Sequence, residues 1–133
     1  MVRFFKYSAA GNDFIIIFEG DLGPFKLTKE NIVRLCDRRF GIGADGILLH
    51  SAPESTEAHA KMTIYNSDGS VAEMCGNGIR CFALYLVQDL NFPVDPLKIE
   101  TGNGLLEAHY EKVGKTYKIS ASLGKAHIFE ETQ

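Results

Sequence analysis

Apolar residues along the chain follow two different periods, and the first of them is typical of strands. The opening residues as far as Ser8 and the run 14–18 are rich in aromatic and β-branched side chains, which strands favour. Residues 9–13 between them read Ala-Ala-Gly-Asn-Asp, a turn composition. The chain is therefore expected to open with two strands separated by a turn.

Two later segments carry apolar residues near the 3.6-residue period of a helix. The first follows Thr28, an expected N-cap, and its apolar positions recur as far as Phe40, with Gly41 as the expected stop. The second begins directly after Cys75 and ends before Asn91. Its apolar positions form one wide stripe at 79, 82, 83, 86, 87 and 90.

The remaining apolar segments are short and strand-like. They cover residues 47–50, 62–65, 97–101, 105–110, 116–120 and 126–129. No internal repeat, low-complexity tract or linker interrupts residues 1–133, so one domain is expected. Many short strands interrupted by two helices favour an α+β fold over an alternating parallel α/β fold.

Composition narrows the classes of protein that the chain can belong to. Its 133 residues suit one domain, and a net charge of −3 offers no basic face for nucleic acid or anionic lipid. The longest apolar run, 14–18, is far too short to span a bilayer, and residues 1–6 do not resemble a secretion signal. Three cysteines without regular spacing argue against a disulfide framework. These features predict a cytoplasmic protein without nucleic-acid or membrane partners.

Two familiar kinds of site are excluded by their context. Residues 41–46 read Gly-Ile-Gly-Ala-Asp-Gly and match the dinucleotide fingerprint. That fingerprint follows a strand and opens a helix, whereas here an expected helix precedes it and an expected strand follows, so we reject it. The four histidines, at 50, 59, 109 and 127, lack ligand spacing, so we expect no metal. His59 and His109 are most simply solvated.

Cys75 differs from the other cysteines in its position. Cys36 and Cys81 lie inside helical segments, where cysteine usually behaves as a small apolar residue. Cys75 stands just ahead of a helix and before Gly76-Asn77-Gly78, so it faces unpaired backbone N–H groups and the positive end of the helix dipole. A thiolate is stabilised in such a place, and the same N–H groups can hold a carboxylate. The bland alternative is a buried structural cysteine beside a glycine-rich cap.

Four ordered stretches resemble the diaminopimelate epimerase family. The most specific are residues 66–70, Asn-Ser-Asp-Gly-Ser, and 75–80, Cys-Gly-Asn-Gly-Ile-Arg, after which Cys81 also fits the family pattern. Residues 11–14, Gly-Asn-Asp-Phe, look like its N-terminal motif, although Ala9 stands where a glycine is common. Residues 35–46 are similar to its second motif. The resemblance covers essentially the whole chain.

The resemblance implies a fold and a reaction. The family interconverts LL- and meso-diaminopimelate without pyridoxal phosphate or metal, in lysine biosynthesis, so no cofactor is expected. Its fold has two pseudo-symmetric halves, each a β-rich, barrel-like sheet around a central helix. The substrate lies between the two helix N-termini, and each half supplies one cysteine for proton transfer.

The family pattern also implies roles for individual residues. Cys75 would be one of the two acid/base groups. Asn12 and Asn66 would hydrogen-bond the substrate, and the backbone of Gly76 and Asn77 would hold its α-carboxylate. Part of the family has glutamine where this chain has Gly46, so any substrate contact from that side chain is absent or replaced.

The resemblance leaves the second half of the active site outside residues 1–133. We therefore expect this chain to be the N-terminal half of an epimerase, to need a complementary C-terminal half and to be inactive alone, with a homodimer left open. A related racemase of another amino acid remains an alternative, although proline racemase-like enzymes usually have histidine in place of Asn77. The other alternative is a non-catalytic domain whose cysteine is structural or redox-sensitive.

Overall fold

The computed structural model describes residues 2–72, 75–123 and 126–132. Two α-helices occur among them, α1 (Lys29–Cys36) and α2 (Gly76–Gln88), together with a short 3-10 helix η1 (Glu19–Asp21). The strands are β1 (Phe5–Ala9), β2 (Asn12–Phe18), β3 (Gly46–Ser51), β4 (Ala60–Asn66), β5 (Val71–Ala72), β6 (Leu97–Thr101), β7 (Gly104–Val113), β8 (Thr116–Leu123) and β9 (Ala126–Thr132). Every expected strand and both expected helices are present, whereas η1 and β5 were not predicted.

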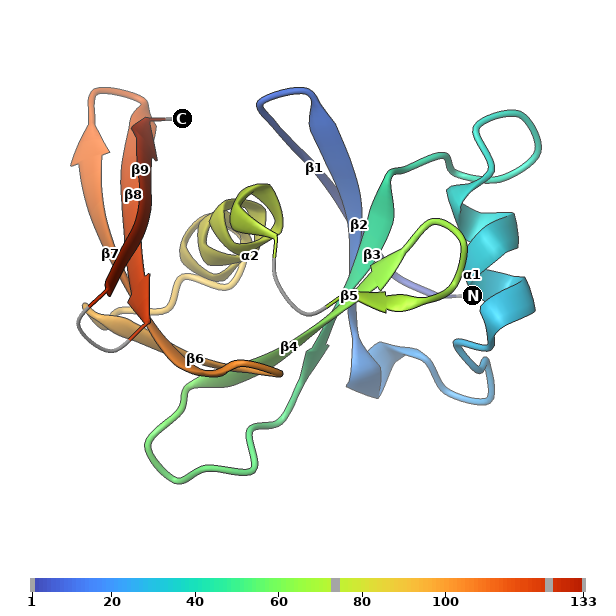
Figure 1. The fold of residues 1–133 in the computed structure, drawn as a ribbon, viewed down its shortest axis with the longest axis horizontal. Coiled ribbons are helices and arrows are strands. Elements are labelled where there is room, and N and C mark those ends of the chain that lie inside the picture. Colours follow the sequence, from blue (N-terminus) through green and yellow to red (C-terminus); the bar gives the residue numbers. More distant parts are fainter. Residues whose placement is uncertain (1, 73–74, 124–125, 133) are drawn as a thin grey trace.

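The strands form one mixed sheet that curls around α2. Its order is β1-β2-β3-β4-β6-β7-β8-β9, with β5 paired to β4. The β2–β3 and β4–β6 pairs are parallel, and the other pairs are antiparallel. Figure 1 shows α2 between one arm of the sheet that contains β1 and β2 and another that contains β7 to β9. This arrangement confirms the α+β class.

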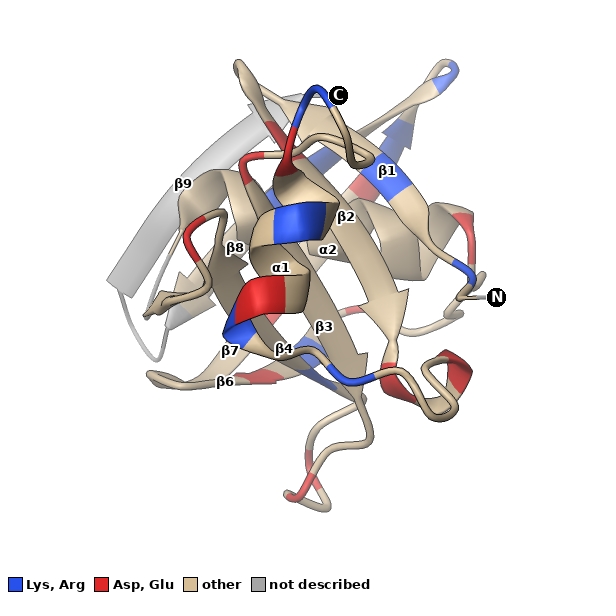
Figure 2. Ribbon diagram, turned by 90° about the vertical axis from the view of Figure 1, so that its right-hand side faces the viewer, with Lys and Arg blue, Asp and Glu red and all other residues tan. Residues whose placement is uncertain are grey.

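The two faces of the central strands belong to different cores. Ile16 and Leu48 pack in the larger core around α2. Ile15, Ile17 and Ile47 pack in a smaller core beneath α1, which lies across the outer face of the sheet (Figure 2). Because both faces are covered, β2 needs an unbroken apolar run instead of the alternation of a half-exposed strand.

The surroundings of α2 differ from the one-sided stripe that the sequence predicted. All residues from Gly78 to Val87 are buried, including Arg80 and Tyr85, which lie off the expected stripe. The helix is enclosed because the sheet curls past it on both sides (Figure 1). The position of a central helix is thereby fixed by contacts around its whole circumference.

The predicted end of the first helix was wrong by about one turn. Thr28 does cap α1, since its Oγ1 accepts the N–H of Asn31 at 3.2 Å. The helix ends at Cys36, because Asp37 is extended and its carboxylate accepts the N–H groups of Arg39 and Phe40 at 2.8 and 3.0 Å. Such side-chain bonds compete with further helical turns. The side chain of Phe40 is consequently 86% exposed.

Candidate active site

Three neighbouring strands bring Asn12 and Asn66 to the same end of the sheet. Asn12 opens β2 and Asn66 closes β4, with the start of β3 between them. Gly46 of β3 lies opposite Phe14 on one side and opposite Asn66 on the other. A Cβ atom at Gly46 would lie 2.5 Å from the carbonyl oxygen of Tyr65, so the spacing of β3 and β4 requires glycine there.

The N-terminus of α2 carries Cys75 as its N-cap. Cys75 has extended backbone angles, φ −152° and ψ 112°, and its side chain makes no capping hydrogen bond. The backbone N–H groups of the first helical turn therefore have no partner within the helix and no cap from this thiol. Cys75 is half-buried, and a Cβ at Gly78 would lie 3.7 Å from its Sγ. Glycine thus leaves space beside the thiol.

Asn77 joins the helix end to the sheet. Its Nδ2 donates to Oδ1 of Asn12 at 2.7 Å, across 65 positions of sequence. Asn12 in turn donates from its Nδ2 to Oδ2 of Asp45 at 3.3 Å. The structure therefore brings Cys75, Gly76, Asn77 and Asn12 together at one end of the fold.

Asp13, Arg38 and Asp45 support this end and were not predicted as site residues. Arg38 donates to both carboxylate oxygens of Asp13, at 2.7 and 3.1 Å, and to Oδ1 of Asp45 at 3.1 Å. The hydrogen bonds from Arg38, together with those from Lys6, hold the pKa of Asp13 well below its usual range. Their position inside two of the family-like stretches was the available signal.

Arg80 occupies the buried side of the same end. It is 2% exposed, and its Nη2 donates to Oδ1 of Asn77 at 3.4 Å. Burial lowers the pKa of its guanidinium, although arginine stays cationic in proteins. Asn77 is thus held between an arginine on one side and Asn12 on the other.

Asn66 belongs to this end but bonds within its own turn. It is exposed, and its Nδ2 donates to Oγ of Ser70 at 3.0 Å. The turn is tied to the loop before β3 by the N–H of Ser67, which donates to the carbonyl oxygen of Asp45 at 3.1 Å. Asn66 is therefore placed near the other residues through the backbone.

The remaining cysteines lie in the cores, as the sequence predicted. Cys36 and Cys81 are 4% and 0% exposed. Burial raises the pKa of the Cys36 thiol and raises that of Cys81 to about 12. All three cysteines within the described part of the chain are free thiols.

His50 serves as a packing group and His59 as an anchor. His50 is buried, with Nδ1 2.8 Å from the hydroxyl of Tyr85. The expectation that His59 is solvated was wrong, because its Nδ1 accepts the N–H of Lys98 at 2.9 Å and ties a loop to β6. His109 is exposed, as expected, with Nδ1 2.9 Å from Asp95. The side chain of His127 lies outside the described residues. No group of ligand residues suited to a metal occurs in the described ranges.

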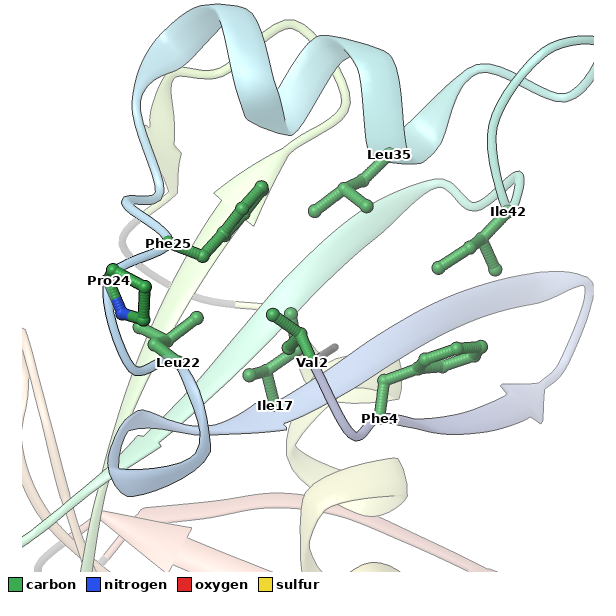
Figure 3. A pocket seen from close by; sticks show the side chains of 8 residues that line it. All are labelled: Val2, Phe4, Ile17, Leu22, Pro24, Phe25, Leu35 and Ile42. Carbon is green, nitrogen blue, oxygen red and sulfur yellow. The ribbon is translucent and has the colours of Figure 1, made fainter.

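An apolar cavity lies away from these residues. It has a volume of about 560 Å³ and opens between α1 and the outer face of the sheet (Figure 3). Its lining is apolar and consists of Val2, Phe4, Ile17, Leu22, Pro24, Phe25, Leu35 and Ile42. None of the predicted site residues lines it, so this cavity is separate from the candidate site.

Sequence comparison places the chain beside known epimerases. A family model described as diaminopimelate epimerase matches residues 4–129. The diaminopimelate epimerase of Halothermothrix orenii is 42% identical over 134 aligned residues, covering 98% of this chain and 46% of the relative. The diaminopimelate epimerase 2 of a Nostoc species is 44% identical, covering 96% and 44%. The chloroplastic enzyme of Oryza sativa subsp. japonica is 44% identical, covering 86% and 32%. The chain spans less than half the length of these relatives.

Solved structures with low sequence identity share the fold. A methylitaconate-delta-isomerase superposes with a TM-score of 0.66 at 18% identity, covering 96% of this chain and 40% of that one. A hydroxyproline epimerase from Agrobacterium vitis also gives a TM-score of 0.66, at 13% identity, covering 88% and 40%. At such identities the likeness establishes the fold alone, which agrees with the barrel-like sheet expected around a central helix. No helix in the described ranges is long and apolar enough to cross a membrane.

Proposed function

We propose that this chain, which belongs to the diaminopimelate epimerase family, supplies half of the active site of a cofactor-independent amino-acid epimerase. Cys75 would be one of two proton-transfer groups, and LL- and meso-diaminopimelate would be the substrates. The reaction would serve lysine biosynthesis. The free thiols suit the reducing environment of the cytoplasm, where we place the enzyme.

One observation supports this proposal most directly. The hydrogen bond from Asn77 to Asn12 joins the first turn of α2 to the start of β2, directly beside Cys75. A thiol, a helix N-terminus and two primary amides thus occupy one end of the fold. Helix N-termini bind carboxylates through their unpaired N–H groups and their dipole. A substrate with an α-carboxylate would therefore present its α-carbon near the thiol.

The proposed reaction uses two cysteines, one as thiolate and the other as thiol. The Cys75 side chain, as thiolate, takes the α-proton or, as thiol, delivers one, according to the direction of turnover. A second cysteine on the opposite face of the α-carbon does the reverse. The net result is inversion at carbon, with one proton moved onto one sulfur and another moved off the second sulfur.

The backbone of Gly76 and Asn77 would hold the carboxylate during this exchange. Removal of the α-proton moves negative charge onto that carboxylate, so fixed N–H donors stabilise the transition state more than the ground state. The loss of one such donor typically costs about 3 kcal/mol in the barrier. Asn12 and Asn66 would supply side-chain hydrogen bonds to the rest of the substrate.

The second cysteine would come from a complementary half-domain. The relatives are more than twice as long as the segments that match this chain, which leaves room for such a half. We propose that residues 1–133 form one half of the cleft and do not epimerise alone. A homodimer of the complete enzyme is compatible with this arrangement.

The test is to supply the remaining segment of a relative in trans. The chain is mixed with the part of the Halothermothrix orenii enzyme that it does not match, and α-hydrogen exchange of LL- and meso-diaminopimelate is followed in deuterated water. We expect exchange from the mixture and none from either part alone. Cys75→Ala should abolish exchange in both directions, while the matched variant Cys36→Ala should retain it.

Two results would contradict the proposal. Exchange that survives Cys75→Ala would remove the acid/base role of that thiol. Efficient exchange by the isolated chain would remove the need for a complementary half. Proline and histidine assayed in parallel distinguish a related racemase, since preferred turnover of either amino acid would reassign the substrate.

A further inference from the structure

Asp45 lies one residue before β3 and connects several parts of the candidate site. Its Oδ2 accepts the Nδ2 hydrogen of Asn12 at 3.3 Å and the backbone N–H of Asp13 at 2.9 Å. Its Oδ1 accepts from Arg38 at 3.1 Å. We propose that Asp45 is a positioning residue, which fixes the orientation of the Asn12 and Asn77 amides. These amides would complete the carboxylate cradle, by which we mean the carboxylate site at the backbone N–H groups of Gly76 and Asn77 beside Cys75. This inference rests on the proposed function.

The carboxylate of Asp45 sets the direction of these hydrogen bonds. An ionised aspartate can only accept hydrogen bonds, whereas a primary amide donates from nitrogen and accepts at oxygen. The amide nitrogen of Asn12 must therefore face Asp45. Its oxygen then points toward α2, where it receives the Nδ2 hydrogen of Asn77 at 2.7 Å.

The amide of Asn77 extends this direction into α2. Because the nitrogen of Asn77 faces Asn12, its oxygen faces Arg80, which donates to it at 3.4 Å. The hydrogen bonds that join Asp45, Asn12, Asn77 and Arg80 form one series. Arginine can only donate, so the series has an obligate acceptor at Asp45 and an obligate donor at Arg80. Both amides between these ends have one favourable orientation.

One amide hydrogen remains on Asn12 and one on Asn77. Each primary amide carries two N–H hydrogens, and each of these two amides uses one within the series. In the parts of the chain that the structure describes, no other hydrogen bond uses the second hydrogen of Asn12 or of Asn77. These hydrogens lie at the same end of the fold as the first turn of α2, where they can supplement its backbone donors toward a carboxylate.

Replacing Asp45 by asparagine would remove the fixed direction. An amide at position 45 has a single oxygen, and the charged guanidinium of Arg38 holds it more strongly than the neutral donors do. The nitrogen of the amide then faces Asn12 and the N–H of Asp13, and Asn12 gains by turning its oxygen toward residue 45. The nitrogens of Asn12 and Asn77 would then oppose each other, and relief would require Asn77 to turn away from Arg80. The shape change at residue 45 is small, so the expected effect comes from hydrogen-bond direction.

The simpler reading is that Asp45 only ties its loop to β2. Side-chain amide resonances separate the two readings in the ¹⁵N-labelled chain. Asp45→Asn should shift the signals of both Asn12 and Asn77, although Asn77 does not contact residue 45. Asp37→Asn is the matched control, because it makes the same change in the same loop and, among the residues that the structure describes, the Asp37 carboxylate accepts from backbone N–H groups alone. If Asn77 keeps its wild-type signals in Asp45→Asn, the positioning role is excluded.

A double variant tests the direction of the series and guards against loss of folding. Asn12→Asp combined with Asp45→Asn exchanges donor and acceptor between these two positions while keeping an acceptor toward Asn77. We expect the Asn77 signals to return to their wild-type positions in this variant. Failure of the Asn77 signals to return in the folded double variant would also overturn the inference.

A chemical probe connects the series to carboxylate binding. Iodoacetate and iodoacetamide alkylate the same thiol, and only iodoacetate carries a carboxylate. In the wild-type chain, the ratio of iodoacetate to iodoacetamide rates at Cys75 should exceed the ratio for glutathione in the same buffer. In Asp45→Asn this ratio should fall roughly three- to tenfold, the size expected for one lost hydrogen bond, while Asp37→Asn should leave it within about twofold of wild type.

The sign of this change distinguishes the causes. Removing a negative charge near the thiol would by itself speed the reaction with an anionic reagent. A fall in the ratio therefore reports the cradle, and a rise would refute the positioning role. A wild-type ratio no higher than that of glutathione would instead refute the carboxylate site, and with it the proposed function. A high wild-type ratio that Asp45→Asn leaves unchanged would refute the role of Asp45 alone.

Discussion

Mild acid is expected to destabilise this protein through His50. The imidazole is 7% exposed and is surrounded by the rings of Phe18, Phe82 and Tyr85, at centroid distances of 4.9 to 5.6 Å. Burial lowers its pKa from 6.5 to about 4. The folded protein therefore resists protonation at a pH where the unfolded chain accepts a proton.

The sign and size of the effect follow from linkage. Between about pH 6.5 and pH 4, the unfolded chain binds a proton at His50 and the folded protein does not. The free energy of unfolding should therefore fall as the pH drops from about 6.5 toward 4. With these two values, the free energy of unfolding should decrease by about 2 kcal/mol between pH 7.5 and pH 5. The full loss, reached below pH 4, should be about 3 kcal/mol.

Urea denaturation at several pH values between 7.5 and 5 measures this directly. His50→Gln should lower stability at pH 7.5, because the ring packing is lost, but should flatten the dependence on pH. His109→Gln is the matched control, since His109 is exposed, and it should keep the wild-type slope. A wild-type protein equally stable at pH 7.5 and pH 5 would refute the reasoning, as would a His50→Gln variant that keeps the full decrease.

Three further outcomes follow from the structure. At pH 8, iodoacetamide should modify Cys75 alone among the described cysteines, because burial raises the pKa of Cys81 to about 12 and also raises that of Cys36. Intact-mass analysis should show one adduct in the wild-type chain and none in Cys75→Ala. Gly78→Ala should slow this alkylation severalfold, since the added methyl group would lie 3.7 Å from the sulfur, while thermal denaturation should show a stability change within about 1 kcal/mol. Leu86→Ala, at a fully buried position of α2, should cost about 2–5 kcal/mol in urea denaturation, whereas Val33→Ala, at a 44% exposed position, should cost less than about 0.5 kcal/mol.

Local patterns predicted the elements well wherever a short segment contains its own signal. The cap at Thr28 and the start of α2 after Cys75 both depend on neighbouring residues. The end of α1 was harder to place, because the carboxylate of Asp37 competes with helical bonds at a position where the apolar period continues. Helical spacing alone does not weigh that competition.

The network around Asp45 could not have been found from spacing. Asn12, Asp45 and Asn77 are separated by 32 to 65 positions and meet only when β2, β3 and α2 pack together. The sequence placed Asn12 and Asn77 in separate motifs and gave Asp45 no role.

The sequence by itself determined the fold class, most strand and helix segments, the family resemblance and the position of one cysteine at a helix start, since each depends on local periods or short motifs. Only the tertiary structure decided that α2 is buried on every side and that Asn77 bonds Asn12. The physical reason is that enclosure and hydrogen-bond partners arise between distant segments, whose approach is set by the curl of the sheet.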